Sequence, residues 1–142
     1  MFDIDNDVVL RKVEAGDFDE LIQDLVKEIE IRNYSVTRIN NIDNIHKRIK
    51  EEDSKQKVSF RFYKIVEFCN LGSCAELISS QLLAGLFMPA RFIVFQPKSE
   101  STISMAFLKP TAFAENFNSS ALMTVARRME RDMTDVLEEF AL

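Results

Sequence analysis

The C-terminal segment of the chain carries a continuous stripe of apolar side chains at helical spacing. Charged and polar side chains fill the positions between them, which is the pattern of an amphipathic helix. We therefore predict a helix over residues 119–140. At about 1.5 Å per residue it is about 30 Å long, enough to cross a whole sheet. Its apolar face is predicted to consist of Leu122, Val125, Ala126, Met129, Met133, Val136, Leu137 and Phe140.

The segments that precede this helix have the pattern of strands. Residues 90–96 are almost continuously apolar, which favours a strand in the middle of a sheet. Residues 97–101 read as a polar turn, and residues 102–107 alternate as a half-covered antiparallel strand does. Residues 58–68 are predicted to form a long strand whose alternation slips once, which indicates a bulge.

The N-terminal part of the chain predicts two strands around a second amphipathic helix. The strands are expected at residues 8–15 and 34–39. Between them, Asp17 and Glu20 have the spacing of a capping pair, and the helix is predicted to end near Asn33.

A further helix is predicted before the central strand, with Gly85 as its C-terminal cap and residues 86–89 as an apolar loop. Residues 111–118 are predicted to be another loop, whose Phe113 and Phe117 must dock against the rest of the molecule. The apolar face of the helix is predicted to contain Cys74, Leu77, Ile78 and Leu82.

Residues 40–57 are predicted to form a solvated connection, with room for a short helix around residues 42–50. His46, the only histidine, lies within it. A metal site would need His46 together with carboxylates such as Asp43 or Glu51. One histidine with scattered acids is more often part of a solvated helix, so neither a metal nor another cofactor is predicted.

The predicted order of elements is β-α-β, a connection, β-α-β-β and α. A chain of 142 residues has the usual size of one domain, so residues 1–142 are expected to form a single domain. We expect the α+β class, with one curved antiparallel sheet and helices packed on one of its faces.

Charge and composition exclude several classes of function. The net charge is −5, and Lys and Arg are spread along the chain, which argues against binding to nucleic acid or anionic membranes. The N-terminus lacks the pattern of a signal peptide, and the apolar runs are too short to cross a bilayer. Cys69 and Cys74 match no zinc or redox motif and are expected to be free thiols in a cytoplasmic protein.

From Tyr63 onward the sequence resembles a known family. The resemblance rests on Tyr-Lys-Ile-Val-Glu-Phe-Cys-Asn at 63–70, Gly-Leu-Phe-Met-Pro-Ala-Arg at 85–91, and a strand pair closed by Lys109-Pro110. The family is catalogued as domain of unknown function 302. The resemblance implies a sheet like that of the TATA-binding protein, in a β-α-β-β-β-β-α layout, and often a dimer. It implies no activity and supplies no catalytic residues.

Two positions depart from the family pattern. Leu71 stands where the family tends to have Pro, and Ala90 stands where it often has Cys. A Pro at the first helical position makes the preceding residue, here Asn70, the expected N-cap. Ser73 with Glu76 is a competing capping box. The absence of Cys at position 90 argues against chemistry by a cysteine pair formed with Cys69.

The junction between the strand ending near Cys69 and the following helix is one candidate site. A helix N-terminus favours a thiolate, so Cys69 is either a reactive thiol or a small buried side chain. The backbone amides from Asn70 to Ser73 either bind an anion or are satisfied by the Asn70 and Ser73 side chains.

An apolar cavity is the other candidate site. The chain is rich in Phe and Met, and a long helix over a curved sheet can leave a cavity, with the segment from Phe113 to Phe117 as its lid. We expect a non-enzymatic binding or interaction module that holds a small apolar ligand. The alternative is a thiol-dependent enzyme or redox protein using Cys69. The candidate ligand-binding residues are Cys69, Asn70, Ser73, Phe87, Met88, Phe113 and Phe117.

A homodimer is also expected, because an open sheet leaves unpaired strand edges. The C-terminal helix offers a second interface, since a basic block is followed by an acidic block that would meet its opposite under a two-fold axis. A solvated face with pairs such as Arg131 and Asp135 is the simpler interpretation. The two blocks are Arg127, Arg128 and Arg131, then Asp132, Asp135, Glu138 and Glu139.

Overall fold

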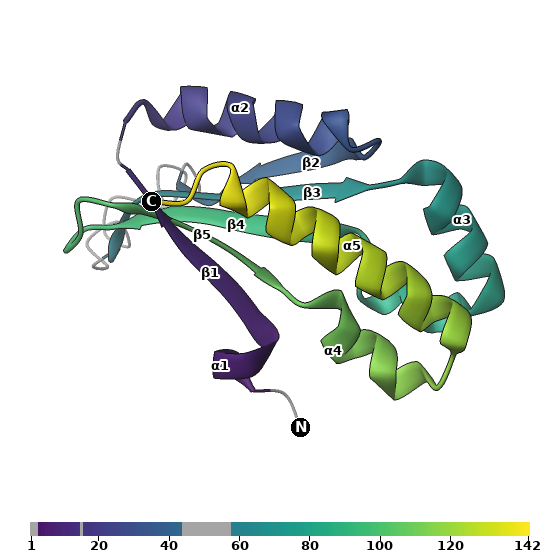
Figure 1. The fold of residues 1–142 in the computed structure, drawn as a ribbon. Helices are drawn as coiled ribbons and strands as arrows, with labels where there is room; N and C mark the ends of the chain where they lie inside the picture. Colours follow the sequence, from purple (N-terminus) through teal and green to yellow (C-terminus); the bar gives the residue numbers. More distant parts are fainter. Residues whose placement is uncertain (1–2, 15, 44–57) are drawn as a thin grey trace, which may run out of the picture.

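The computed structural model describes residues 3–14, 16–43 and 58–142. Its strands and its three longest helices follow one another in the order that the sequence predicts (Figure 1). In chain order they are α1 (Ile4–Asp7), β1 (Val8–Val13), α2 (Phe18–Ile31), β2 (Ser35–Asn41), β3 (Phe60–Cys69), α3 (Leu71–Ser80), the 3-10 helix η2 (Leu82–Leu86), β4 (Ala90–Pro97), β5 (Ile103–Leu108), α4 (Pro110–Ala114), the 3-10 helix η3 (Glu115–Phe117) and α5 (Ser120–Glu138).

The strands form one five-stranded antiparallel sheet in the order β1-β5-β4-β3-β2. Helices α2 and α5 lie on the same side of this sheet (Figure 1). The α+β class, the antiparallel sheet and the placement of helices on one face are therefore confirmed. β4 occupies the predicted central position, while β1 and β2 are the two edges. The pairing of β3 with β4 shifts register between Phe60 and Phe62, close to the slip in alternation from which the sequence predicts a bulge.

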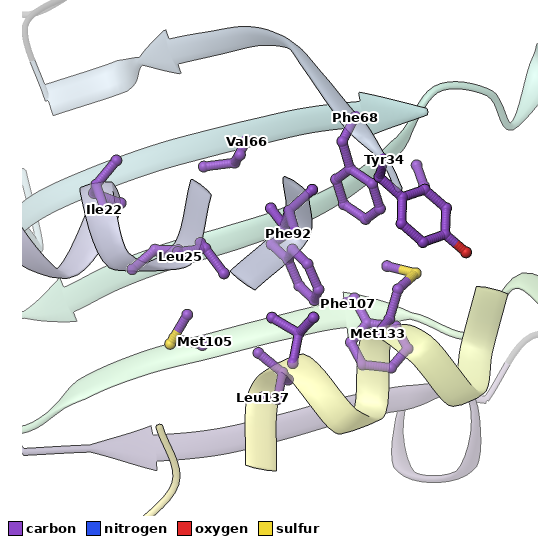
Figure 2. Packing of buried hydrophobic residues seen from close by; sticks show 14 of the residues in the cluster. Ile22, Leu25, Tyr34, Val66, Phe68, Phe92, Met105, Phe107, Met133 and Leu137 are labelled. Carbon is purple, nitrogen blue, oxygen red and sulfur yellow. The ribbon is translucent and has the colours of Figure 1, made fainter. Parts of the chain in front are cut away.

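The main core lies between the sheet and the two long helices. Leu25 of α2, Phe92 of β4 and Leu137 of α5 gather there and are fully buried (Figure 2). Burying a side chain of this size contributes about 1.5–3 kcal/mol. A second cluster, which includes Leu77 and Leu122, fills the space between α3, α4 and α5. Cavities are expected where two such clusters meet incompletely.

Side-chain caps fix where the long helices begin. Asp17 accepts a hydrogen bond from the Glu20 backbone N–H (3.1 Å) at the start of α2, as predicted. Ser119 accepts one from the Leu122 N–H (3.2 Å) at the start of α5. Each cap satisfies a backbone donor that has no partner within the helix.

The end of α3 differs from the prediction. The helix stops at Ser80, and the chain tightens into η2, which contains Gly85 without a left-handed conformation. Gly85 is therefore not the cap of α3. A 3-10 turn has three residues rather than 3.6, so it rotates the apolar pattern off its face. Leu82, predicted on the buried face, is 78% exposed.

Two further predictions are corrected. The predicted loop over residues 111–118 is largely helical, because Pro110 opens α4 with a preset φ and η3 continues it. β5 is covered on both faces rather than half covered. Ser104 and Ala106 point away from the helices, but they are small and lie between larger neighbours on β1 and β4.

The predicted connection at residues 40–57 lies mostly outside the described residues, as does the short helix proposed around residues 42–50. Its first two positions, Asn40 and Asn41, extend β2. Strand β2 is therefore longer than the sequence pattern indicated.

Candidate functional site

A pocket of about 290 Å³ opens where the C-terminal end of α2, the start of α3 and the middle of α5 meet. Polar and charged side chains make up much of its wall, and we call it the polar pocket. The residues that line it are Arg32, Asn33, Tyr34, Asn70, Ser73, Cys74, Leu77, Met88, Val125, Arg128, Met129 and Asp132.

A second pocket of about 290 Å³ lies between the η2–β4 segment, α4 and α5, and we call it the apolar pocket. Met129 lines both pockets, and the adjacent residues Met88 and Pro89 line one each. The two pockets are therefore neighbours. The residues that line the apolar pocket are Leu86, Phe87, Pro89, Ala90, Arg91, Leu108, Pro110, Phe113, Met129 and Met133.

Tyr34 and Asp132 both line the polar pocket and are joined by a side-chain hydrogen bond. The Tyr34 hydroxyl donates a hydrogen bond to Asp132 Oδ2 at 2.7 Å. Burial raises the pKa of Tyr34 well above its ordinary value, and the Asp132 carboxylate raises it further. Tyr34 is therefore a neutral donor at physiological pH, and its hydrogen bond connects the segment just before β2 to α5.

The two arginines of the polar pocket differ in how they are engaged. Arg32 Nη1 lies 2.8 Å from Glu28 Oε2, and Arg32 Nη2 lies 3.9 Å from Glu139 Oε1. Arg128 Nη2 donates to the Ser73 hydroxyl at 3.3 Å. Among the described residues, Arg128 takes part in no ion pair. Its charge is the one in this pocket that lacks an acidic partner in the described structure.

Asn70 and Ser73 form the N-terminal cap of α3. Asn70 Oδ1 accepts a hydrogen bond from the Ser73 backbone N–H (3.1 Å), and Asn70 Nδ2 donates to the Asn33 carbonyl (3.0 Å). Asn70 rather than Ser73 is thus the N-cap. Since the Asn70 side chain already accepts the hydrogen bond of the Ser73 backbone amide, this amide is not available to an anion.

Cys69 and Cys74 are both free thiols. Cys69 is buried and lines neither pocket, whereas Cys74 is partly exposed and lines the polar pocket. Burial raises the pKa of the Cys69 thiol, and the neighbouring Cys74 thiol raises it further. This protonation preference is opposite to that of an activated nucleophile.

The phenylalanines predicted near a cavity form one aromatic group. Phe87 stacks on Phe113 with ring centroids 5.7 Å apart and contacts Phe117 at 5.6 Å. Phe87 and Phe113 line the apolar pocket, while Phe117 contacts Phe87 and lines neither pocket. Met88 lines the polar pocket.

The sequence predictions missed the residues that complete the polar pocket. Arg32 and Tyr34 lie between α2 and β2, whereas Asp132 lies in α5, and no local pattern marks them as partners. The sequence analysis places Arg128 in the basic block of the C-terminal helix and Met129 on its apolar face, and it assigns neither residue to a binding site. A pocket built from four distant segments has no short sequence motif, so only the folded arrangement reveals it.

Other site predictions have less support in the described structure. Within residues 3–14, 16–43 and 58–142, no group of three His, Cys, Asp or Glu side chains is arranged to hold a metal ion. His46 lies outside these residues. Arg131 and Asp135, which are described, form no ion pair. Of the described helices, none combines the length and the apolar character that crossing a bilayer requires.

The fold and pockets define an α+β protein with an open antiparallel sheet and two adjoining cavities at one end. Residues 10–140 match the family described as "Domain of unknown function DUF302". The chain belongs to this family. A similar fold occurs in the crystal structure of an uncharacterized conserved DUF302 protein from Bacillus stearothermophilus, with a TM-score of 0.79 and 22% identity. The alignment covers 95% of this chain and 98% of that one. No curated protein matches the chain significantly.

Proposed function

We propose that this protein is a non-enzymatic binding module that holds a small, largely apolar ligand in the apolar pocket. The observation that carries this proposal is the pair of adjoining cavities with Met129 in common. Ligand sites are concave and mostly apolar, have volumes of about 300–1,000 Å³, and contain a few polar groups that orient the ligand. The two pockets together meet this description, and each alone is at its lower limit.

The alternative is a thiol-dependent enzyme or redox protein that uses Cys69. The buried position of Cys69 and its raised pKa argue against this alternative, because the thiolate is the nucleophile. Timed alkylation followed by mass spectrometry separates the two functions. The binding module predicts that Cys74 is labelled before Cys69. Rapid labelling of Cys69, with an apparent pKa well below about 8.5, would favour the enzyme.

We also propose that the protein acts as a homodimer in the cytoplasm. The edge strands β1 and β2 support a dimer, since backbone groups at a sheet edge can pair with a second chain. The two free thiols are consistent with a reducing compartment.

The binding proposal is tested with N-phenyl-1-naphthylamine, an uncharged apolar fluorophore. We expect saturable binding of one probe per chain to the unmodified protein. Phe113→Ala removes part of the apolar wall and should weaken binding several-fold, because the lost ring supplies contact area.

Phe62→Ala is a matched control for this variant. Phe62 and Phe113 are similarly exposed, at 39% and 36%, and each stacks on another phenylalanine. Phe62 lines neither pocket. If both variants weaken binding equally, or if binding does not saturate, the probe is bound by general apolar surface and the proposal is wrong.

A further inference from the structure

We infer that the ligand is an amphipathic anion, whose negatively charged head group binds Arg128 in the polar pocket while its apolar body occupies the apolar pocket. This inference rests on the proposed function and adds the chemical class of the ligand. Three observations carry it: one pocket has polar and charged lining residues and the other mostly apolar ones, Arg128 is charged, and Met129 lines both pockets.

The apolar pocket suits a hydrocarbon body. The parallel rings of Phe87 and Phe113 form one side of it, and Met133 of α5 forms another. Arg91 is the one charged residue among those that line it, and its side chain is exposed at the β4 end. A ligand group held between these walls gains from burial of apolar area and finds few polar partners.

The polar pocket supplies a cation for an anionic group. Arg32 is already engaged by Glu28, and Asp132 accepts the Tyr34 hydroxyl. Arg128 contacts only the Ser73 hydroxyl among the described polar groups, and this leaves most of its five N–H donors for a ligand. A guanidinium binds a carboxylate or a similar oxyanion through two parallel hydrogen bonds. The Ser73 hydroxyl next to it is a second donor.

Met129 of α5 is the lining residue that the two pockets have in common. It lines both of them and is 5% exposed. Methionine has three rotatable bonds and a polarizable sulfur, so it can move aside and then pack against an inserted chain. Because this adaptable side chain lines both the pocket that contains Arg128 and the apolar pocket, a single elongated ligand can occupy both.

The test compares two probes that differ only at the head group. Decanoate carries a carboxylate, and decanol carries a neutral hydroxyl. Isothermal titration calorimetry at pH 7.5 should show that the unmodified protein binds decanoate at least about tenfold more tightly, since a hydrogen bond to a charged group is worth about 1.5–3 kcal/mol.

Arg128→Ala should remove this preference by weakening decanoate binding about tenfold and leaving decanol binding unchanged. Arg127→Ala is the matched control, because Arg127 is the exposed neighbour on α5 and lines neither pocket. Arg127→Ala should bind both probes as tightly as the unmodified protein does. Because it changes the net charge by the same amount as Arg128→Ala, it controls for long-range charge effects on decanoate binding.

Three results would overturn the inference. Equal affinity for decanoate and decanol in the unmodified protein excludes the anionic head group while the binding module stands. Loss of the preference in Arg91→Ala but not in Arg128→Ala places the head group at the wrong pocket. If neither decanoate nor decanol binds, the inference fails, and failure of the fluorophore to bind as well means that the binding module fails with it.

Discussion

Single residues explain how the polar pocket is held together. Tyr34 directly precedes β2 and Asp132 lies in α5, so their hydrogen bond of 2.7 Å joins two segments that are far apart in sequence. Tyr34 is also packed at a right angle against Phe68, with ring centroids 5.6 Å apart. One side chain therefore serves the apolar core through its ring and the pocket wall through its hydroxyl.

Tyr34→Phe should lower the free energy of unfolding at pH 8 by about 1 kcal/mol, because it removes one hydrogen bond and retains the ring. The variant should also be less sensitive to alkaline pH. The pKa of Tyr34 is raised in the folded state. Its contribution is therefore complete below the unfolded pKa of about 10 and is lost as pH rises above that value.

Urea unfolding at pH 8 and pH 10.5 measures both effects. The unmodified protein should lose more stability between these pH values than Tyr34→Phe does. Tyr63→Phe is the control for loss of a tyrosine hydroxyl, since Tyr63 is the other tyrosine of the chain, stacks on Phe95 and lines neither pocket. If Tyr34→Phe lost more unfolding free energy between pH 8 and pH 10.5 than the unmodified protein, the role assigned to this hydrogen bond would be contradicted.

At the scale of elements, the start of α3 determines how the polar pocket is shaped. Asn70 both caps α3 and binds the Asn33 carbonyl, so it connects the helix to the turn after α2. Asn70→Ala should lower the free energy of unfolding by about 1 kcal/mol, within the range of about 0.5–2 kcal/mol for a lost cap.

Ser73→Ala is the comparison for this variant, because Ser73 is the other residue whose spacing suits a cap. Its hydroxyl contacts Arg128 instead of a backbone amide of α3. We expect Ser73→Ala to cost less stability than Asn70→Ala in urea unfolding. The opposite order would mean that the helix starts three residues later in solution.

Helices and strands with a strong apolar pattern can be predicted from the sequence. Elements whose conformation depends on packing against other segments cannot. The apolar stripe of α5 and the continuous apolar run of β4 each point to one structure. Gly85 illustrates the opposite case, since its residue type fits a helix cap but the chain forms a 3-10 turn there. The sequence predicts a loop over residues 111–118 because Pro110 can end a strand, but Pro110 also starts a helix.

The candidate site was predictable only in its local parts. Asn70, Ser73, Phe87, Met88 and Phe113 are predicted from local features of the sequence, and each lines one of the two pockets. The raised pKa of the Cys69 thiol depends on burial and on the neighbouring Cys74 thiol. Neither of these can be recognised from a sequence pattern. Contacts between distant segments were beyond the reach of spacing arguments.

At the scale of the whole molecule, assembly remains the main prediction. The acidic block of α5 is partly occupied within the chain, because Glu138 binds Arg11 at 2.8 Å, Glu139 lies 3.9 Å from Arg32, and Asp132 accepts the Tyr34 hydroxyl. Fewer acids therefore remain to meet the basic block of a second copy. This observation favours a dimer built on a sheet edge over one built on α5.

Sedimentation velocity at micromolar protein should show a dimer, with an interface of about 1,200 Å² or more. Raising salt to about 0.5 M should have little effect, since an edge-to-edge contact relies on backbone hydrogen bonds rather than screened charges. Charge reversal of Arg127, Arg128 and Arg131 should leave the dimer intact. A single species near 16.4 kDa at all concentrations would exclude the dimer. Dissociation of the dimer by charge reversal would instead support an interface on α5.

The binding of a ligand between α4, α5 and the sheet is tested most directly by NMR of methyl-labelled methionines. The chain has six methionines, of which Met129 and Met133 line the apolar pocket, whereas Met105 lies fully buried in the sheet and lines neither pocket. Titration with N-phenyl-1-naphthylamine should shift the methyl signals of Met129 and Met133 saturably and leave that of Met105 unchanged. If Met129 and Met133 do not shift, or if Met105 shifts equally, the account of the site is wrong.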